Sequence, residues 1–175
     1  MAVLAALVAI AAAGCTGAEP VEDSRTPLPS VPAPTQDARG RAEEAALDAY
    51  RGMWQAYAKA GLTANPDEPS LAVHTTGEAL ANLKGGLAKL RRDGEVVKGE
   101  YQSDPQVAGA SPAAMPSSIS VQDCLNTERF LTYKTATGAL ADDVPGGNRA
   151  VRATVTRDDG GWKVSSFGVQ TVGSC

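Results

Sequence analysis

Polar and apolar residues alternate along residues 149–175, and this period of two predicts a long β-hairpin near the C-terminus. Val151, Ala153 and Val155 alternate with polar residues, so one face of the first arm would lie on a core and the other in water. Residues 158–161, Asp-Asp-Gly-Gly, supply the turn, because glycine tolerates positive φ and aspartate hydrogen-bonds to its own backbone.

The return arm, residues 162–169, changes the parity of its apolar positions after Val164. We therefore expect a β-bulge near Ser165 or Ser166. A bulged, strongly twisted hairpin belongs to a curved sheet, and a curved sheet needs helices across its concave face.

The apolar residues between Gly40 and Gly61 recur with helical spacing and predict a first long helix. Those on the stripe are Ala46, Ala49, Tyr50, Met53 and Tyr57. Trp54 lies beside this stripe and widens it toward a neighbouring element. Glu43 would lie in the first turn and Lys59 in the last, where each charge suits the helix dipole.

A second long helix is predicted by a series of leucines. They are Leu80, Leu83, Leu87 and Leu90. Thr75 and Glu78 have the spacing of a capping box, and Gly94 would end the helix. The pair Gly85–Gly86 inside it should cost about 2 kcal/mol relative to alanines, so we expect close packing or a kink there. Residues 70–74 could form a single helical turn before it.

Strand-like patterns follow the second helix. We expect strands over residues 96–101 and 118–125, a short pairing piece at 106–108, an extension at 130–134 and a polar loop at 138–147. Helices first and strands afterwards make an α+β fold, with two long helices packed on a curved, mostly antiparallel sheet that ends in the C-terminal hairpin.

Composition sets the number of domains and excludes one class of partner. The chain has 175 residues, 43% of them hydrophobic, which suits one domain with a modest core. Its net charge is −4, and its lysines and arginines are scattered singly. Without a basic patch for a phosphate backbone, nucleic acid is excluded as a partner.

The first forty residues predict export and a membrane anchor. Residues 1–14 contain an uncharged apolar run too short to span a membrane but suited to a signal peptide. The segment Ala12-Ala13-Gly14-Cys15 resembles the lipobox of bacterial lipoproteins, which implies a lipid on Cys15. A plain secretory signal, with Cys15 incidental, is the alternative. The proline-rich residues 15–40 predict a disordered tether rather than a docking motif.

Several short motifs resemble the nuclear transport factor 2-like superfamily, whose fold is a cystatin-like cone, and within it small lipoproteins of high-GC Gram-positive, actinobacterial type. The residues that carry the resemblance are 76–80, 121–124, Gly138, 159–164 and Cys175. It implies a domain over residues 41–175, with helices over a curved antiparallel sheet that can enclose a pocket. Small-molecule isomerases and cyclases belong to the same superfamily.

The cysteines at positions 124 and 175 predict a disulfide. Once Cys15 is assigned to lipid, Cys124 and Cys175 remain, and an exported pair is usually oxidised. Closing a loop of about fifty residues should stabilise the fold by about 4 kcal/mol. The rival is a reactive thiol with His74 as base, but nothing in the sequence orients this sole histidine. One histidine and two paired thiols also give no metal site.

Carboxylates are the remaining candidates for chemistry. The pairs at 142–143 and 158–159 are better explained as turn formers than as an acid and a base. Asp123 lies within an alternating strand and could face a pocket as a general base. We favour the plainer interpretation, a solvated or backbone-bonded residue at a strand end.

The function expected from the sequence is a non-enzymatic binding or interaction module on the outer face of the cell membrane, held there by lipid. It would bind a small apolar ligand or another envelope protein and needs no cofactor. Its pocket would be lined by Met53, Trp54, Tyr57, Tyr101 and Asp123. The alternative is an isomerase-like or cyclase-like enzyme with Asp123 as base and Tyr57 or Tyr101 as acid or oxyanion donor.

Overall fold

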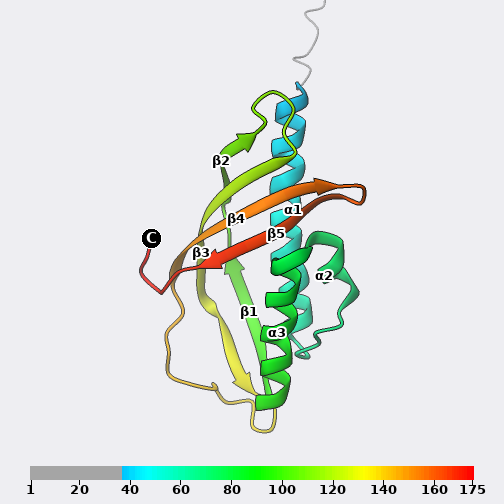
Figure 1. Ribbon diagram of the computed structural model, residues 1–175. Helices are drawn as coiled ribbons and strands as arrows, with labels where there is room; N and C mark the ends of the chain where they lie inside the picture. Colours follow the sequence, from blue (N-terminus) through cyan, green and yellow to red (C-terminus); the bar gives the residue numbers. More distant parts are fainter. Residues whose placement is uncertain (1–36) are drawn as a thin grey trace, which may run out of the picture. The chain divides into compact units, whose positions relative to one another are not determined.

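A computed structural model describes residues 37–175, in which three helices precede five strands (Figure 1). The predicted α+β class and the order of elements are confirmed. The signal peptide at 1–14, Cys15 and residues 15–36 of the predicted tether lie outside the described residues. No helix within residues 37–175 is both long enough and apolar enough to cross a membrane.

Helix α1, Ala38–Gly61, begins earlier than predicted. Asp37 caps it by accepting a hydrogen bond from the Gly40 backbone N–H at 2.7 Å. The last residues assigned to the tether are therefore helical. The short helix α2, Pro69–His74, matches the predicted turn, and helix α3, Gly77–Asp93, is the second long helix.

The start of α3 differs from the prediction. Its N-cap is Thr76, which makes no side-chain capping bond. The Thr75 hydroxyl instead donates to the Leu71 carbonyl at 2.6 Å, so the capping box is wrong. The explanation of Gly85 by close packing is also wrong, because a β-carbon at this position or at Gly86 would meet no atom within 4 Å.

Five strands form one antiparallel sheet. They are β1 Glu95–Gln102, β2 Gln106–Ser111, β3 Ser118–Lys134, β4 Asn148–Asp158 and β5 Gly161–Val169. The order is β1-β3-β4-β5, and β2 also pairs with β3. Strand β3 is a single 17-residue strand where the sequence pattern predicted two pieces.

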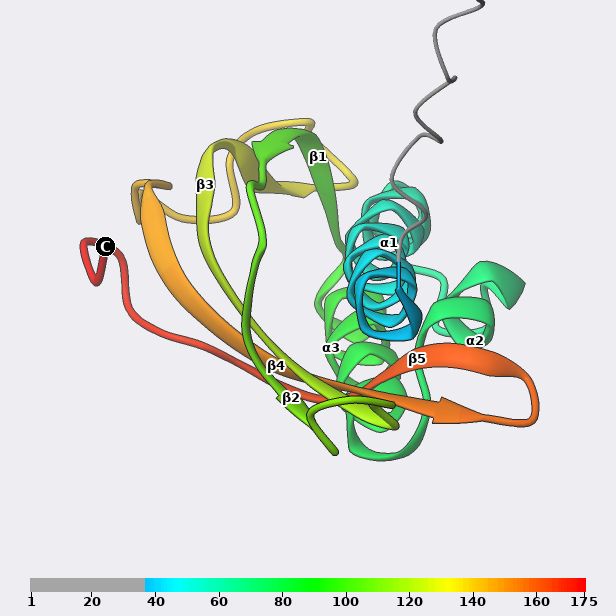
Figure 2. The same cartoon turned by 90° about the horizontal axis from the view of Figure 1, so that it is seen from above.

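The length of β3 explains how the sheet curves. Its first half pairs with β2 and its second half with β1, and β4 pairs with it from Ser118 to Asn126. Register shifts interrupt the pairing of β3 with β1 and with β2, and such irregularities bend a strand. Figure 2 shows the result, a sheet that curls around α1 and α3.

The C-terminal hairpin contains the predicted bulge. In the pairing of β4 with β5, Thr154 lies opposite Ser166 and Val155 lies opposite Val164. Ser165 is therefore the extra residue, and its hydroxyl donates to the Thr154 carbonyl at 3.1 Å. The hairpin turn is stabilised as expected, because the Asp158 carboxylate accepts a hydrogen bond from the Gly160 N–H at 2.8 Å.

The predicted disulfide joins Cys124 of β3 to Cys175, with Cα atoms 5.9 Å apart. The segment after β5 runs beside β4, where the Gln170 N–H donates to the Ala150 carbonyl at 2.9 Å. The Ser174 hydroxyl in turn accepts from the Ala150 N–H at 2.8 Å. The cross-link thus fastens this segment to the middle of the sheet.

Candidate functional site

Asp123, the carboxylate singled out by sequence, lies on the concave side of β3 and is only 7% exposed. Its Oδ2 atom accepts hydrogen bonds from the Tyr50 hydroxyl at 3.0 Å and the Ser103 hydroxyl at 2.7 Å. Its Oδ1 atom accepts from the backbone N–H of Asp104 at 3.0 Å. One carboxylate therefore joins α1, the β1–β2 connection and β3.

This arrangement corrects the sequence-based interpretation in part. Asp123 is backbone-bonded, as favoured, but it is buried rather than solvated, and it lies inside β3 rather than at a strand end. Three donors occupy most of the roughly four acceptor positions of this carboxylate, and its burial restricts the approach of a substrate. Burial, and secondly the adjacent Asp123 carboxylate, raise the pKa of the Tyr50 phenol well above its ordinary value, so Tyr50 remains a donor.

Trp54 is the centre of an aromatic cluster under the sheet. Its ring centroid lies 6.4 Å from Tyr50 and 6.1 Å from Tyr57, both on α1. It also lies 6.2 Å from Tyr101 of β1 and 6.0 Å from Phe167 of β5. Because β1 and β5 are opposite ends of the sheet order, one indole contacts both ends of the curl. Its N–H is buried and has no hydrogen-bond partner of good geometry within residues 37–175.

The other residues predicted to line a pocket also belong to this packed interior. Met53 is fully buried, and Tyr57 and Tyr101 both contact Phe130 of β3, at 6.3 and 5.6 Å between ring centroids. Burial raises the pKa of Tyr57 and of Tyr101. Among the described residues neither tyrosine bonds to Asp123, so the tyrosine that meets this carboxylate is Tyr50, not the two named from sequence.

The other sequence candidates do not form a reactive site. Both thiols of the domain are in the disulfide, which removes the nucleophile that His74 would have activated. The His74 ring instead packs over Gly52 of α1, and burial lowers its pKa. No group of three or more potential metal ligands occurs within residues 37–175.

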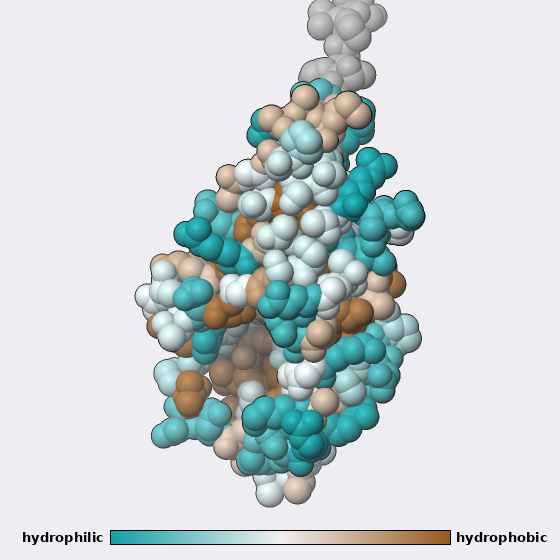
Figure 3. All heavy atoms as spheres, in the orientation of Figure 1, coloured by the Kyte–Doolittle hydropathy of each residue, from teal (hydrophilic) through white to brown (hydrophobic). Residues whose placement is uncertain are grey.

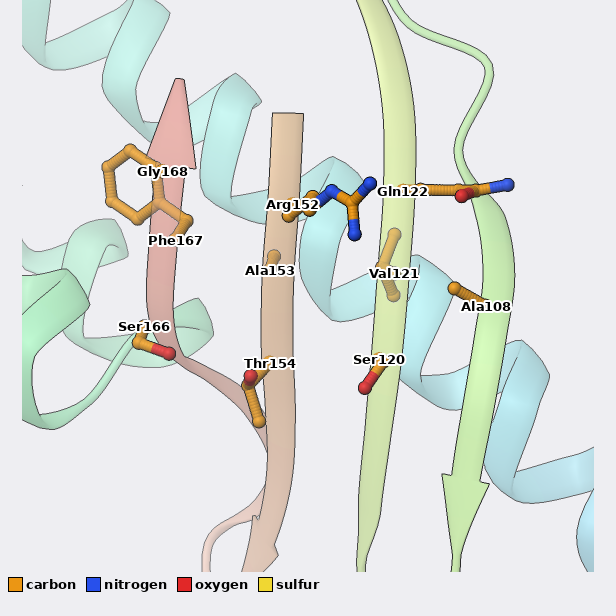
Figure 4. Close-up of a pocket in the computed structure, with 10 residues that line it drawn as sticks. All are labelled: Ala108, Ser120, Val121, Gln122, Arg152, Ala153, Thr154, Ser166, Phe167 and Gly168. Atoms are coloured by element: carbon orange, nitrogen blue, oxygen red, sulfur yellow. The ribbon is translucent and has the colours of Figure 1, made fainter. Parts of the chain in front are cut away.

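The hollows of the domain include two on the outer face of the sheet, the face turned away from the helices. One has a volume of about 360 Å³ and is drawn in Figure 4. Its lining residues are Ala108, Ser120, Val121, Gln122, Arg152, Ala153, Thr154, Ser166, Phe167 and Gly168. A second, of about 330 Å³, shares Gln122 and Arg152 with the first and reaches the disulfide.

A further hollow of about 290 Å³ lies between the second half of β3 and the loop at 139–146. Leu140 and Val144 of this loop are 51% and 59% exposed. Asp142 and Asp143 are at the same place, and Asp142 accepts a hydrogen bond from the Val144 N–H at 3.1 Å, as expected of a turn former. On this side of the domain Figure 3 shows a hollow with hydrophobic residues at its base.

Comparison with known proteins bears on the fold alone. No protein-family model and no curated protein matches the chain. Among solved structures, the chain is similar to the intermembrane space region of the chloroplast protein ARC6, with a TM-score of 0.50 and 16% identity. That match covers 79% of this chain and 99% of the other.

A second solved structure is a protein of unknown function with a cystatin-like fold from Nostoc punctiforme. Its TM-score is 0.44 and its identity 8%, over 73% of this chain and 92% of that one. At these identities neither neighbour assigns a function.

Sequence reasoning missed the partners of Asp123. The alternation of Ile119 and Val121 with polar residues already places Asp123 on the buried face, and a buried carboxylate requires donors. Tyr50 was visible on the buried stripe of the first helix. Ser103 lies in a connection without a periodic pattern, so nothing local pointed to it.

Proposed function

We propose that the chain is an extracytoplasmic lipoprotein whose folded domain is a binding module rather than an enzyme. The anchor rests on the sequence, namely the apolar run at 1–14, Cys15 with its small neighbours, and the proline-rich residues 15–36. The Cys124–Cys175 disulfide is in keeping with an oxidising compartment.

The proposal that the domain is not an enzyme rests on the hydrogen bonds that Asp123 accepts. The enzymatic alternative needs this carboxylate as a free base at the wall of a cavity. It is instead buried against three donors, in a pattern typical of a structural acceptor that holds elements together. The interior beside it is occupied by side chains such as Tyr50, Met53 and Trp54, which are at most 5% exposed.

The hollows on the surface of the domain are its candidate binding sites. Pockets of a few hundred cubic ångströms with convergent polar groups are typical of binding sites, and the outer face of the sheet offers two adjoining ones. We therefore favour recognition of an envelope component at the surface over an apolar ligand deep in the cone.

The anchor is tested by detergent-phase partitioning of the full chain expressed in a Gram-positive host. Wild-type protein is expected in the detergent phase, and the Cys15→Ala variant in the aqueous phase or the medium. Thr16→Ala, at the neighbouring position, is the matched control and should partition as wild type. Membrane retention of Cys15→Ala would show that lipid on Cys15 is not the anchor.

The binding role is tested by photo-crosslinking in intact cells. A photoreactive residue at Gln122, exposed on the outer face, should give a discrete adduct, and one at Arg51, exposed on α1, is the control. The enzymatic alternative predicts a different result. Turnover of an isomerase substrate panel, abolished by Asp123→Asn in a protein that still folds, would overturn the proposal.

A further inference from the structure

The two hollows on the outer face are neighbours that share Gln122 and Arg152 in their walls, and together they are here called the outer groove. It runs along β3 and β4 from the disulfide, past Arg152, to the hydroxyls of Thr154 and Ser166. Figure 4 shows the hollow of about 360 Å³, here called the wider end of the groove, with Ala108 on β2 and Gly168 on β5 at its two sides. An elongated shape of this kind suits an extended chain better than a compact ligand.

The groove exists because small residues stand where a sheet normally presents larger side chains. Ser120, Thr154 and Ser166 face one another across three strands. Gly168 forms one side, and a β-carbon added there would meet no atom within 4 Å. Because the side chains at these positions are small, hydroxyl groups and backbone atoms form the floor of the groove.

The charge of the groove is unusual for this chain. Arg152 is exposed, and no ion pair to it occurs in the described part of the chain. In Figure 4 its guanidinium lies toward Gln122 of β3. None of the ten residues that line the wider end is acidic, although the chain carries a net charge of −4. The wider end therefore presents one cation without an ion-pair partner among hydrogen-bonding groups.

The hollow that reaches the disulfide, here called the narrower end, contains acidic residues, but their side chains already accept hydrogen bonds. Asp123 accepts from Tyr50, Ser103 and Asp104 on the other side of the sheet. The Asp104 carboxylate accepts from the Gln106 side-chain amide at 3.3 Å. These carboxylates are not in contact with Arg152.

We propose that the outer groove binds an extended peptide segment of a partner protein, with an acidic side chain of that segment at Arg152. A guanidinium matches the planar, two-oxygen geometry of a carboxylate. The Ser and Thr hydroxyls and the Gln122 amide can both donate and accept, as peptide N–H and C=O groups require. This inference rests on the proposed binding function and specifies the partner's chemistry.

The test uses the oxidised full chain, ¹⁵N-labelled, and two blocked pentapeptides, Gly-Ser-Glu-Ser-Gly and its Gln counterpart. The Glu peptide should shift amide signals of β3, β4 and β5 around the groove, and the Gln peptide should bind about tenfold more weakly. Arg152→Gln should weaken the Glu peptide to the level of the Gln peptide. Lys163→Gln on β5, which removes the same charge outside the groove, should not.

Two further variants separate the groove from charge alone. Gly168→Leu should block the groove without disturbing the fold, because space is open above this residue. Thr154→Val should weaken the Glu peptide several-fold, whereas Thr156→Val, on the same strand but outside the groove, should leave its affinity unchanged.

Equal binding of both peptides, or binding that survives Arg152→Gln and Gly168→Leu, would overturn the proposal. So would binding of inorganic phosphate at the same residues without binding of the Glu peptide. The proposed function is judged separately by crosslinking in cells. A partner crosslinked at another surface of the domain would support a binding module and would reject only the proposal that the outer groove is the binding site.

Discussion

Replacing Tyr50 with phenylalanine removes one atom from the buried group that holds Asp123. Tyr50 is fully buried, and its hydroxyl donates to the Asp123 carboxylate at 3.0 Å. The variant keeps the ring and its contact with Trp54, so the perturbation is confined to the hydrogen bond. Water has little access to replace the lost donor, because Asp123 itself is only 7% exposed.

The expected loss follows from these contacts. A hydrogen bond to a charged group contributes roughly 1.5–3 kcal/mol. Because Ser103 still donates to the same Oδ2 atom, we place the loss in the lower half, at about 2 kcal/mol. For a domain of about 140 residues that corresponds to a decrease in Tm of about 7 °C.

The assay is urea and thermal unfolding followed by circular dichroism. Tyr57→Phe is the matched control, since the Tyr57 hydroxyl has no hydrogen bond to any of the residues that the structure describes. It should change the free energy of unfolding by less than about 0.5 kcal/mol. Equal losses for the two variants, or a loss below that limit for Tyr50→Phe, would refute a structural role for the Tyr50–Asp123 bond.

Four further predictions concern stability. Gly52→Ala should lower the free energy of unfolding by more than about 1 kcal/mol, because its β-carbon would overlap the His74 ring. Gly85→Ala should raise it by about 0.5–1 kcal/mol in the same urea titration. Reducing the Cys124–Cys175 disulfide should cost about 4 kcal/mol, measured with and without reductant; an unchanged midpoint would contradict this. Burial lowers the pKa of His74, so its contribution is present above its ordinary pKa of 6.5 and lost as pH falls through the folded pKa. Tm should therefore fall between pH 7.5 and 5.5, and His74→Gln should flatten that dependence.

Much of the fold was predictable because its signals are local. The parity change after Val164 predicted a bulge near Ser165 or Ser166, and the structure has it at Ser165. Two cysteines in a chain expected to be exported predicted their bond. Boundaries were less accurate where several residues compete for a cap. Thr75 was chosen over Thr76 as the cap of α3, although its hydroxyl bonds backward to Leu71.

The site was less predictable because its contacts are distant in sequence. Asp123 lies 73 residues from Tyr50 and 20 from Ser103, and neither separation leaves a periodic signature. The outer groove has a different cause. Its small residues are scattered over four strands, and each is an unremarkable polar or small position until the register aligns them.

Because α1 packs against β5, the domain cannot complete its fold until the end of the chain has been synthesised. Trp54 is in the first helix, and Phe167, its contact on the far side of the curl, is in the last strand. A chain that emerges with its N-terminus first therefore exposes the apolar stripe of α1 until more than a hundred residues have followed. Such long-range closure is slow, and an exposed stripe invites aggregation in the interval. A partly synthesised copy of this domain is consequently more prone to aggregate than the complete domain, in which β5 covers α1.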